Sequence, residues 1–250
     1  ASVAAPATSS PIVTRDEAGG VVVRATRVTL PVKIDGQLDD EVYSAVPAIT
    51  EFIQQEPDTG APVSEKTEVW LMFDESNIYL SCRCWDQHPE RIVANDMRRD
   101  GSRQTAHDNF TVTIDTFHDR RNGFLFGITA AGGLRDGQTT DERPNMNWNA
   151  VYEGKASRFP GGWIAELAIP FRSIRYIPGS GQVWGIQIRR YINSKNERAH
   201  ITAISPASGT LAINFMSQAA TLIGIDTPPP AKNIEVKPYA ITGVTTDRLS

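Results

Sequence analysis

An alternating stretch at residues 108–136 constrains the fold of this chain more than any other feature. In its first half, Phe110, Val112 and Ile114 alternate with threonines and acidic or amide residues. A period of two is the pattern of a strand with one buried face. A polar run ending in Asn122-Gly123 follows, and both of these residues tolerate the positive φ that favours chain reversal. Because a second alternating run comes next, the stretch predicts an antiparallel hairpin at the centre of an all-β core.

Short strand-like runs continue along most of the chain. The pattern predicts strands over 21–34, 69–73, 78–85, 148–154, 163–169, 183–191, 200–204, 211–216 and 220–225. Short helical turns are expected near 39–46, 89–95 and 171–176, and residues 136–147 are expected to form a polar loop. Many short strands with almost no long helical period predict an all-β fold, a β-sandwich of two antiparallel sheets in immunoglobulin-like or jelly-roll layers.

The domain organisation follows from composition. Residues 1–20 are small and polar, which predicts a flexible segment, and residues 21–226 form the predicted sandwich. Residues 227–250 begin with a stiff proline spacer, and a strand-like stretch at 234–242 would either return to the sandwich edge or begin a following module. Residues 1–20 also resemble the linker left after signal-peptide removal, although a chain boundary without biological meaning would look the same.

Charge and hydropathy exclude two classes of partner. With 25 basic and 29 acidic residues the net charge is -4, and no basic stripe is present to hold the phosphates of a nucleic acid. No apolar run reaches the roughly 20 residues of a membrane helix, so this segment is not expected to insert into a membrane.

The two cysteines, Cys82 and Cys84, lie two positions apart in a predicted strand. Such side chains are parallel and about 6.5 Å apart, which is poor geometry for a disulfide. We therefore expect two buried thiols, and a lone Cys-x-Cys pair is a weak indication of a metal site.

Five segments taken in order are similar to the family 9 carbohydrate-binding modules and their relatives: IDGQLDDEVY, TEVWLMFDESNIYLSCRCWD, DNFTVTIDTFHDRRNGFLFGI, WIAELAIPFRSIRY and WGIQIRRY. The resemblance covers about residues 30–225. It implies a two-sheet sandwich that binds sugars without catalysis. In xylanase-linked members it implies a glycan chain end held between tryptophans, with structural calcium nearby. Where family members usually have tryptophan this chain has Tyr43, which we expect to be a packing position.

The subgroup that the chain resembles most carries this module ahead of a region similar to an outer-membrane barrel. The resemblance therefore implies secretion across the inner membrane, a periplasmic or outer-membrane location, and a following barrel-like domain as a partner. The strand-like stretch at 234–242 fits the start of that region.

Sugar recognition needs aromatic faces together with fixed hydrogen-bonding groups. Trp163 and Trp184 are in phase with apolar neighbours and are expected in the core. The candidate ligand-binding residues are Trp148, Trp85, Trp70, Arg83, Asn109, Arg98 and Arg189, with Thr111, Gln187 and Arg99 as further polar candidates. Trp70 and Trp85 would line an open sheet face or lie in a second buried layer. Trp148 would be a stacking platform or would cap the sandwich edge.

Catalytic and metal chemistry have weaker support in the sequence. No spacing pairs Asp108, Asp115 and Glu166 as a glycosidase would need, and no nucleophile or metalloprotease motif is present. No cofactor is certain, and the metal ligands are unknown. Structural calcium is possible through the carboxylates of Asp115, Asp119, Asp136 and Asp141, although solvated turns would explain them. A haem-binding variant of this sandwich among distant relatives would need an axial Met, His or Lys, and Met72 and Met97 are candidates for that ligand.

Two functions follow as hypotheses. The first is non-catalytic binding of xylan- or cellulose-type oligosaccharides, or of glycan chain ends, by a module of a larger protein involved in carbohydrate catabolism. The alternative is a structural or interaction domain without sugar affinity that docks on, or gates, a following outer-membrane barrel.

Overall fold

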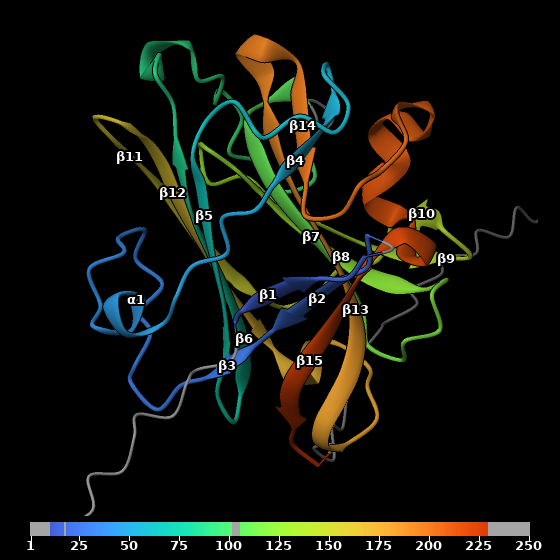
Figure 1. The fold of residues 1–250 in the computed structure, drawn as a ribbon. Coiled ribbons are helices and arrows are strands. Elements are labelled where there is room, and N and C mark those ends of the chain that lie inside the picture. The colour runs from blue at the N-terminus through green and yellow to red at the C-terminus, as the bar shows by residue number, and fades with distance from the viewer. Residues whose placement is uncertain (1–10, 18, 102–105, 230–250) are drawn as a thin grey trace, which may run out of the picture.

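The protein folds as two β-sheets packed face to face, as seen in a computed structural model that describes residues 11–17, 19–101 and 106–229 (Figure 1). The described residues therefore confirm the predicted all-β sandwich. The domain boundaries at residues 20 and 226 stay predictions. The proposed strand at 234–242 lies outside the described residues, whereas Val13–Arg15, inside the expected flexible segment, pairs with Val21–Val23.

The larger sheet has ten strands, in the order β1-β2-β15-β13-β7-β8-β9-β10, with β14 between β13 and β4. Its strands are β1 (Val13–Arg15), β2 (Val21–Arg24), β4 (Ile53–Glu56), β7 (Asn109–Asp115), β8 (Gly123–Thr129), β9 (Leu134–Thr140), β10 (Arg143–Asn145), β13 (Gly179–Ile192), β14 (Glu197–His200) and β15 (Ala220–Thr227).

The smaller sheet has five strands, in the order β11-β12-β6-β5-β3. These are β3 (Thr26–Arg27), β5 (Thr67–Phe73), β6 (Asn77–Trp85), β11 (Glu153–Phe159) and β12 (Gly162–Pro170). The two pairings β2–β15 and β3–β5 are parallel, and the other described strand pairs are antiparallel. The helical elements are α1 (Val42–Ala45) and the 3-10 helices η1 (Pro89–Arg91), η3 (Phe171–Ser173), η4 (Asn193–Lys195), η5 (Pro206–Asn214) and η6 (Met216–Gln218).

The predicted central hairpin is β7–β8, with Phe110 opposite Ile128 and Val112 opposite Phe126. Its turn differs from the prediction, because positive φ occurs at His118 and Arg120 rather than at Asn122-Gly123. The carboxylate of Asp115 accepts hydrogen bonds from the backbone N–H groups of Phe117, Asp119 and Arg120, and so it fixes the reversal before Gly123 begins β8.

Several sequence predictions of secondary structure are wrong. The strand expected at 148–154 begins only at Glu153, the first residue that pairs with β12, and residues 28–34 and 201–204 of two other expected strands lie outside the strands. Much of the expected polar loop at 136–147 belongs to β9 and β10. The backbone of β8 pairs with that of β9, and backbone hydrogen bonds of this kind do not require apolar side chains. The expected strand at 211–216 is helical. Ser205 and Pro206 begin η5 there, with the Ser205 hydroxyl accepting a hydrogen bond from the N–H of Ala207.

The core lies between the sheets and contains the apolar face of each predicted strand. Trp163 and Trp184 are fully buried, as predicted. Cys82 and Cys84 are buried free thiols with their sulfur atoms 3.8 Å apart, which confirms that interpretation. Among the described residues no helix is both long and apolar enough to cross a bilayer.

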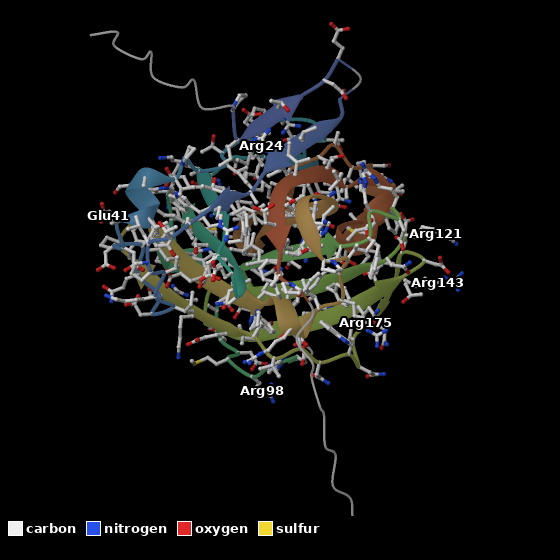
Figure 2. The ribbon with its side chains drawn as sticks, turned by 90° about the horizontal axis from the view of Figure 1, so that it is seen from below. Arg24, Glu41, Arg98, Arg121, Arg143 and Arg175 are labelled. Atoms are coloured by element: carbon white, nitrogen blue, oxygen red, sulfur yellow. The ribbon has the colours of Figure 1, made fainter. Side chains whose placement is uncertain are left out.

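Both outer faces of the sandwich are partly covered, and the two covers differ (Figure 1). The segment around α1 covers the five-stranded sheet through a second apolar cluster that includes Val42, Tyr43 and Trp70. The segment containing η5 and η6 packs on β7 and β13 of the ten-stranded sheet. Figure 2 shows the charged side chains of Glu41, Arg121 and Arg143 around the outside of this assembly.

Candidate functional site

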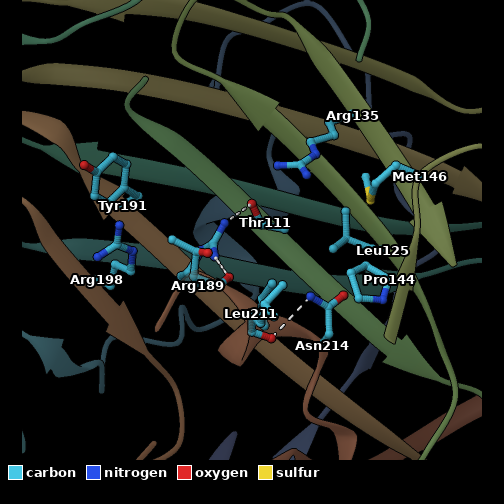
Figure 3. Close-up of a pocket in the computed structure, with 12 residues that line it drawn as sticks. Thr111, Leu125, Arg135, Pro144, Met146, Arg189, Tyr191, Arg198, Leu211 and Asn214 are labelled. Carbon is cyan, nitrogen blue, oxygen red and sulfur yellow. Dashed lines mark hydrogen bonds between the residues drawn. The ribbon is translucent and has the colours of Figure 1, made fainter. Parts of the chain in front are cut away.

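A cavity of about 80 Å³ lies on the outer face of the ten-stranded sheet, where residues of η5 form one side of its lining (Figure 3). We call it the arginine cavity. Its lining combines the cationic Arg135, Arg189 and Arg198, the polar Thr111, Thr210 and Asn214, and the apolar Leu125, Pro144, Met146, Tyr191, Leu211 and Ile213. Alternation places Thr111 and Arg189 on this face because their neighbours Phe110, Val112 and Ile188 point into the core.

Arg189 forms the floor of the cavity and is only 5% exposed. Its guanidinium donates to the backbone oxygen of Thr210 at 3.1 Å and to the hydroxyl of Thr111 at 3.4 Å. Its Nε has no hydrogen-bond partner among the described residues. Burial, followed by the positive charges of Arg135 and Arg198, lowers the pKa of Arg189 to about 9.

The other two guanidinium groups differ in their partners. Arg198 stacks on the ring of Tyr191, with 4.9 Å to its centroid, and forms an ion pair with Glu56. Arg135 is half-buried on β9 and has no hydrogen bond or ion pair to another described residue. Burial lowers the pKa of Arg135, and the carboxylate of Asp100 opposes that effect. Asp100 itself lies 3.7 Å from Arg99.

The far wall of the cavity comes from β10 and the residues after it. Met146 packs against Gly137, where an added Cβ would lie 2.8 Å from the Met146 sulfur, so a larger residue there would displace this side chain. Two residues later, the half-buried Trp148 packs against Phe124 and Phe126, with ring centroids 5.2 and 6.0 Å apart. The indole therefore anchors the segment that carries Pro144 and Met146 into the cavity wall.

Of the sequence-predicted ligand residues, the structure brings Arg189 and Asn109 together near this cavity. Asn109 is buried, donates to the backbone oxygen of His107 at 2.7 Å, and lines a small hollow beside Arg135 and Thr111. Gln187 lies on the same face but is fully buried and donates to Thr202 at 2.7 Å.

Three further candidates lie on the opposite side of the molecule, on the outer face of the five-stranded sheet. Trp70 is 4% exposed and donates to the backbone oxygen of Val46 at 3.1 Å, so it belongs to the second buried layer, and a ligand would reach it only if α1 moved. Arg83 is stacked over the Trp70 ring at 5.5 Å. Trp85 is half-buried between Phe159 and Lys66, and its indole N–H donates to Glu68 at 3.1 Å.

The remaining candidates, Trp148 and Arg98, lie apart from both faces. Trp148 occupies the sandwich edge, which is the second of the two positions considered for it, and its role as a stacking platform stays a prediction. Arg98 is at the rim of the molecule (Figure 2), where it pairs with Asp96 at 2.8 Å. Its neighbour Arg99 instead binds the buried carboxylate of Asp136 at 2.6 Å.

The acidic candidates do not converge. Asp108 and Asp115 lie at opposite ends of β7, and Glu166 is buried on the other sheet, where it accepts from Tyr43 at 2.5 Å. Tyr43 also packs edge-on against Trp70, which confirms its packing role. Asp119 holds its own turn through Asn122, Asp141 pairs with Arg121, and no group of three or more His, Cys, Asp or Glu in the described residues could hold a metal ion.

Most of the residues that line the cavity are not among the sequence-predicted site residues, notably Arg135, Met146, Leu211 and Asn214. Arg135 and Met146 fall in or beside a stretch that has no apolar period. One usable signal was present, because Gly127 and Gly137 occupy outward positions on adjacent strands and leave space that larger side chains would fill. Leu211 and Asn214 carried no such signal, because their placement depends on how η5 folds back.

The two-sheet architecture and a polar, partly apolar cavity on one sheet face define a β-sandwich with the features of a ligand-binding module. The family model described as "Carbohydrate family 9 binding domain-like" matches residues 34–214, and the chain belongs to this family. No curated protein matches the chain significantly.

Solved structures share the fold at low sequence identity. A family 9 carbohydrate-binding module from Caldicellulosiruptor kristjanssonii in complex with glucose is 17% identical, with a TM-score of 0.55, and the match covers 86% of this chain and 100% of that one. The same module with cellotriose is 16% identical at the same TM-score and coverage. A putative carbohydrate-binding protein from Bacteroides uniformis ATCC 8492 is 10% identical with a TM-score of 0.62, covering 81% and 98%.

Proposed function

We propose that this chain is a non-catalytic carbohydrate-binding module whose ligand occupies the arginine cavity. The observation that carries the proposal is the mixed lining, in which Arg189 and Asn214 offer fixed polar groups beside the apolar Leu125 and Met146. Sugar rings present hydroxyl groups at their edges and C–H groups on their faces, so both kinds of lining have a counterpart on the ligand. Family membership and the sugar complexes of the similar structures support the proposal.

For the ligand and the biological context we propose xylan- or cellulose-type oligosaccharides, or glycan chain ends, bound by a module of a larger exported protein for carbohydrate catabolism. A location in the periplasm or at the outer membrane, ahead of a barrel-like domain, is part of the same proposal. These finer statements are supported by the order of the family-like segments alone.

The absence of catalysis is also proposed. The described lining of the arginine cavity contains no Asp or Glu, and general acid–base hydrolysis of a glycoside needs two carboxyl groups across the scissile bond. Glu166 and Asp115 accept hydrogen bonds that hold Tyr43 and the β7–β8 turn in place, which gives both carboxyl groups structural roles.

Filling the cavity mouth tests the proposal. Leu211 is 49% exposed and lines the cavity, so Leu211→Trp would place an indole at its opening. We expect this change to weaken binding of cello- or xylo-oligosaccharides by roughly tenfold or more, equal to about 1.4 kcal/mol. Calorimetric titration and tryptophan fluorescence would measure the affinity.

The matched control is Val183→Trp, because Val183 is similarly exposed at 47% and lies outside the cavity lining. It should bind as the wild type does. If the wild type shows no saturable heat or fluorescence change with either series of sugars, the sugar-binding proposal is wrong and the interaction-domain hypothesis is favoured.

A further inference from the structure

We propose that the arginine cavity selects sugars that carry a carboxylate, namely uronate units of acidic glycans. This inference rests on the proposed function and narrows it from carbohydrates in general to one chemical class. In this inference, the guanidinium groups of Arg135 and Arg189 bind the carboxylate of the sugar.

The charge balance of the cavity is the first observation. Three guanidinium groups line it, and no carboxylate does so in the described residues. Glu56 neutralises Arg198, and Asp100 lies against Arg99, which leaves Arg135 and Arg189 without an ion-pair partner among the described residues. Burying uncompensated charge is costly, so a site of this kind is completed by an anion. The chain as a whole is acidic, and the positive charge of this cavity is therefore local.

The unused hydrogen-bonding capacity is the second observation. Arg189 is 5% exposed, yet its Nε has no partner among the described residues. Arg135 projects into the same space, and its guanidinium makes no hydrogen bond or ion pair to another described residue (Figure 3). Guanidinium groups are donors only, and their planar fork matches the two oxygens of a carboxylate. A neutral sugar would satisfy some donors but would leave both guanidinium groups without an ion-pair partner.

The apolar part of the lining distinguishes a sugar acid from a bare anion. Leu125, Pro144, Met146 and Leu211 surround the cationic floor on the remaining sides. A small inorganic anion gains nothing from such surfaces, whereas the C–H face of a pyranose ring can pack on them. The combination fits a ring that carries a carboxylate better than it fits phosphate or sulfate.

A matched pair of ligands tests the inference on the wild-type protein. An oligosaccharide ending in glucuronate and the same oligosaccharide with its carboxyl group reduced to the alcohol differ only at C6, where a charged carboxylate is replaced by a neutral hydroxymethyl group. We expect the uronate form to bind roughly tenfold or more tightly, because charge-assisted bonds are about twice as strong as neutral ones. The preference should shrink as the salt concentration rises. Inorganic phosphate and sulfate form two further titrations.

Two variants assign the effect to the cavity. Arg135→Met keeps an unbranched apolar stem and removes the charged guanidinium, and it should reduce the uronate preference to within about threefold, while binding of the reduced sugar stays near the wild-type value. Because Arg135 has no partner in the described chain, the variant should be at least as resistant to urea as the wild type. Arg24→Met makes the same change of charge at the exposed end of β2, outside the cavity lining, and should leave the preference intact.

The outcomes separate this inference from the proposed function. Equal affinity for the uronate and the reduced sugar would overturn the inference and leave sugar binding standing. Tight binding of phosphate or sulfate that excludes the uronate would overturn it in favour of an inorganic or phosphorylated ligand. Binding of neither sugar would overturn both proposals together. An unchanged preference in Arg135→Met would also reject the role given to this cavity.

Discussion

At the scale of single residues, several polar side chains are buried inside this protein. His200 is a clear case, because it is fully buried, its Nε2 lies 3.2 Å from the side-chain oxygen of Gln55, and its Nδ1 has no partner among the described residues. Burial, with the charges of Arg189 and Arg198, lowers the pKa of His200 well below its usual value. The ring is therefore neutral in the folded state.

A neutral buried histidine makes stability depend on pH. Below about pH 6.5 the unfolded chain binds a proton at this position and the folded chain does not, so the free energy of unfolding falls as the pH falls, by up to about 1.4 kcal/mol per pH unit. His200→Gln should remove this contribution, and urea unfolding at pH 7.5, 6.5 and 5.5 would measure it. The exposed His88 is the control, since His88→Gln should keep the wild-type slope. Parallel pH profiles for the wild type and His200→Gln would contradict the assignment.

At the scale of elements, one buried side chain on β13 joins the two sheets. Arg190 is fully buried and donates to the hydroxyl of Thr67 at 2.8 Å and to the backbone oxygens of Lys66 at 3.1 Å and Trp85 at 2.5 Å. These acceptors belong to β5 and β6 or directly precede them, in the smaller sheet. The guanidinium therefore supplies hydrogen-bond donors to buried acceptors of the smaller sheet, and at Lys66 it adds to the bond that the backbone N–H of Trp85 already donates.

Removing this contact should be costly. Arg190→Met should lower the free energy of unfolding by about 3 kcal/mol or more, because several buried acceptors lose their donor at once. Chemical denaturation would measure the loss. Arg175→Met removes an arginine from an exposed position and should change stability by no more than about 0.5 kcal/mol. A loss in Arg190→Met as small as that of the control would show that the buried contacts contribute little.

At the scale of the whole molecule, the protein is a sandwich with a different cover on each outer face. Over the five-stranded sheet, residues near α1 close a second apolar layer around Trp70, Met72 and Tyr79. Over the ten-stranded sheet, η5 and η6 lie above polar strand residues, and the packing leaves the arginine cavity. The cover over the five-stranded sheet leaves Trp70 little accessible surface, whereas the cover over the ten-stranded sheet leaves the arginine cavity.

The two thiols are buried at the centre of the molecule, so their rate of chemical labelling can report on global unfolding. Cys82 and Cys84 are both 0% exposed on β6, with β5 and β12 on either side and the core above. A thiol reagent should reach them only through global unfolding, so the opening free energy from the labelling rate should equal that from urea unfolding. Mass spectrometry would count the labels. Labelling of either thiol much faster than global unfolding would indicate local opening of this sheet.

The sequence by itself determined most of the strands, the central hairpin, the core tryptophans and the two buried thiols. These features follow from a period of two and from covalent reach, both of which act between near neighbours in the chain. Only the tertiary structure decided which outward residues are buried and which meet. Thr111, Arg135, Arg189 and Asn214 come from four separate segments, and η5 brings them around one cavity by packing on strands far away in sequence. Alternation assigns a side chain to a face of its sheet, but whether that face is open to water depends on long-range packing that no local pattern encodes.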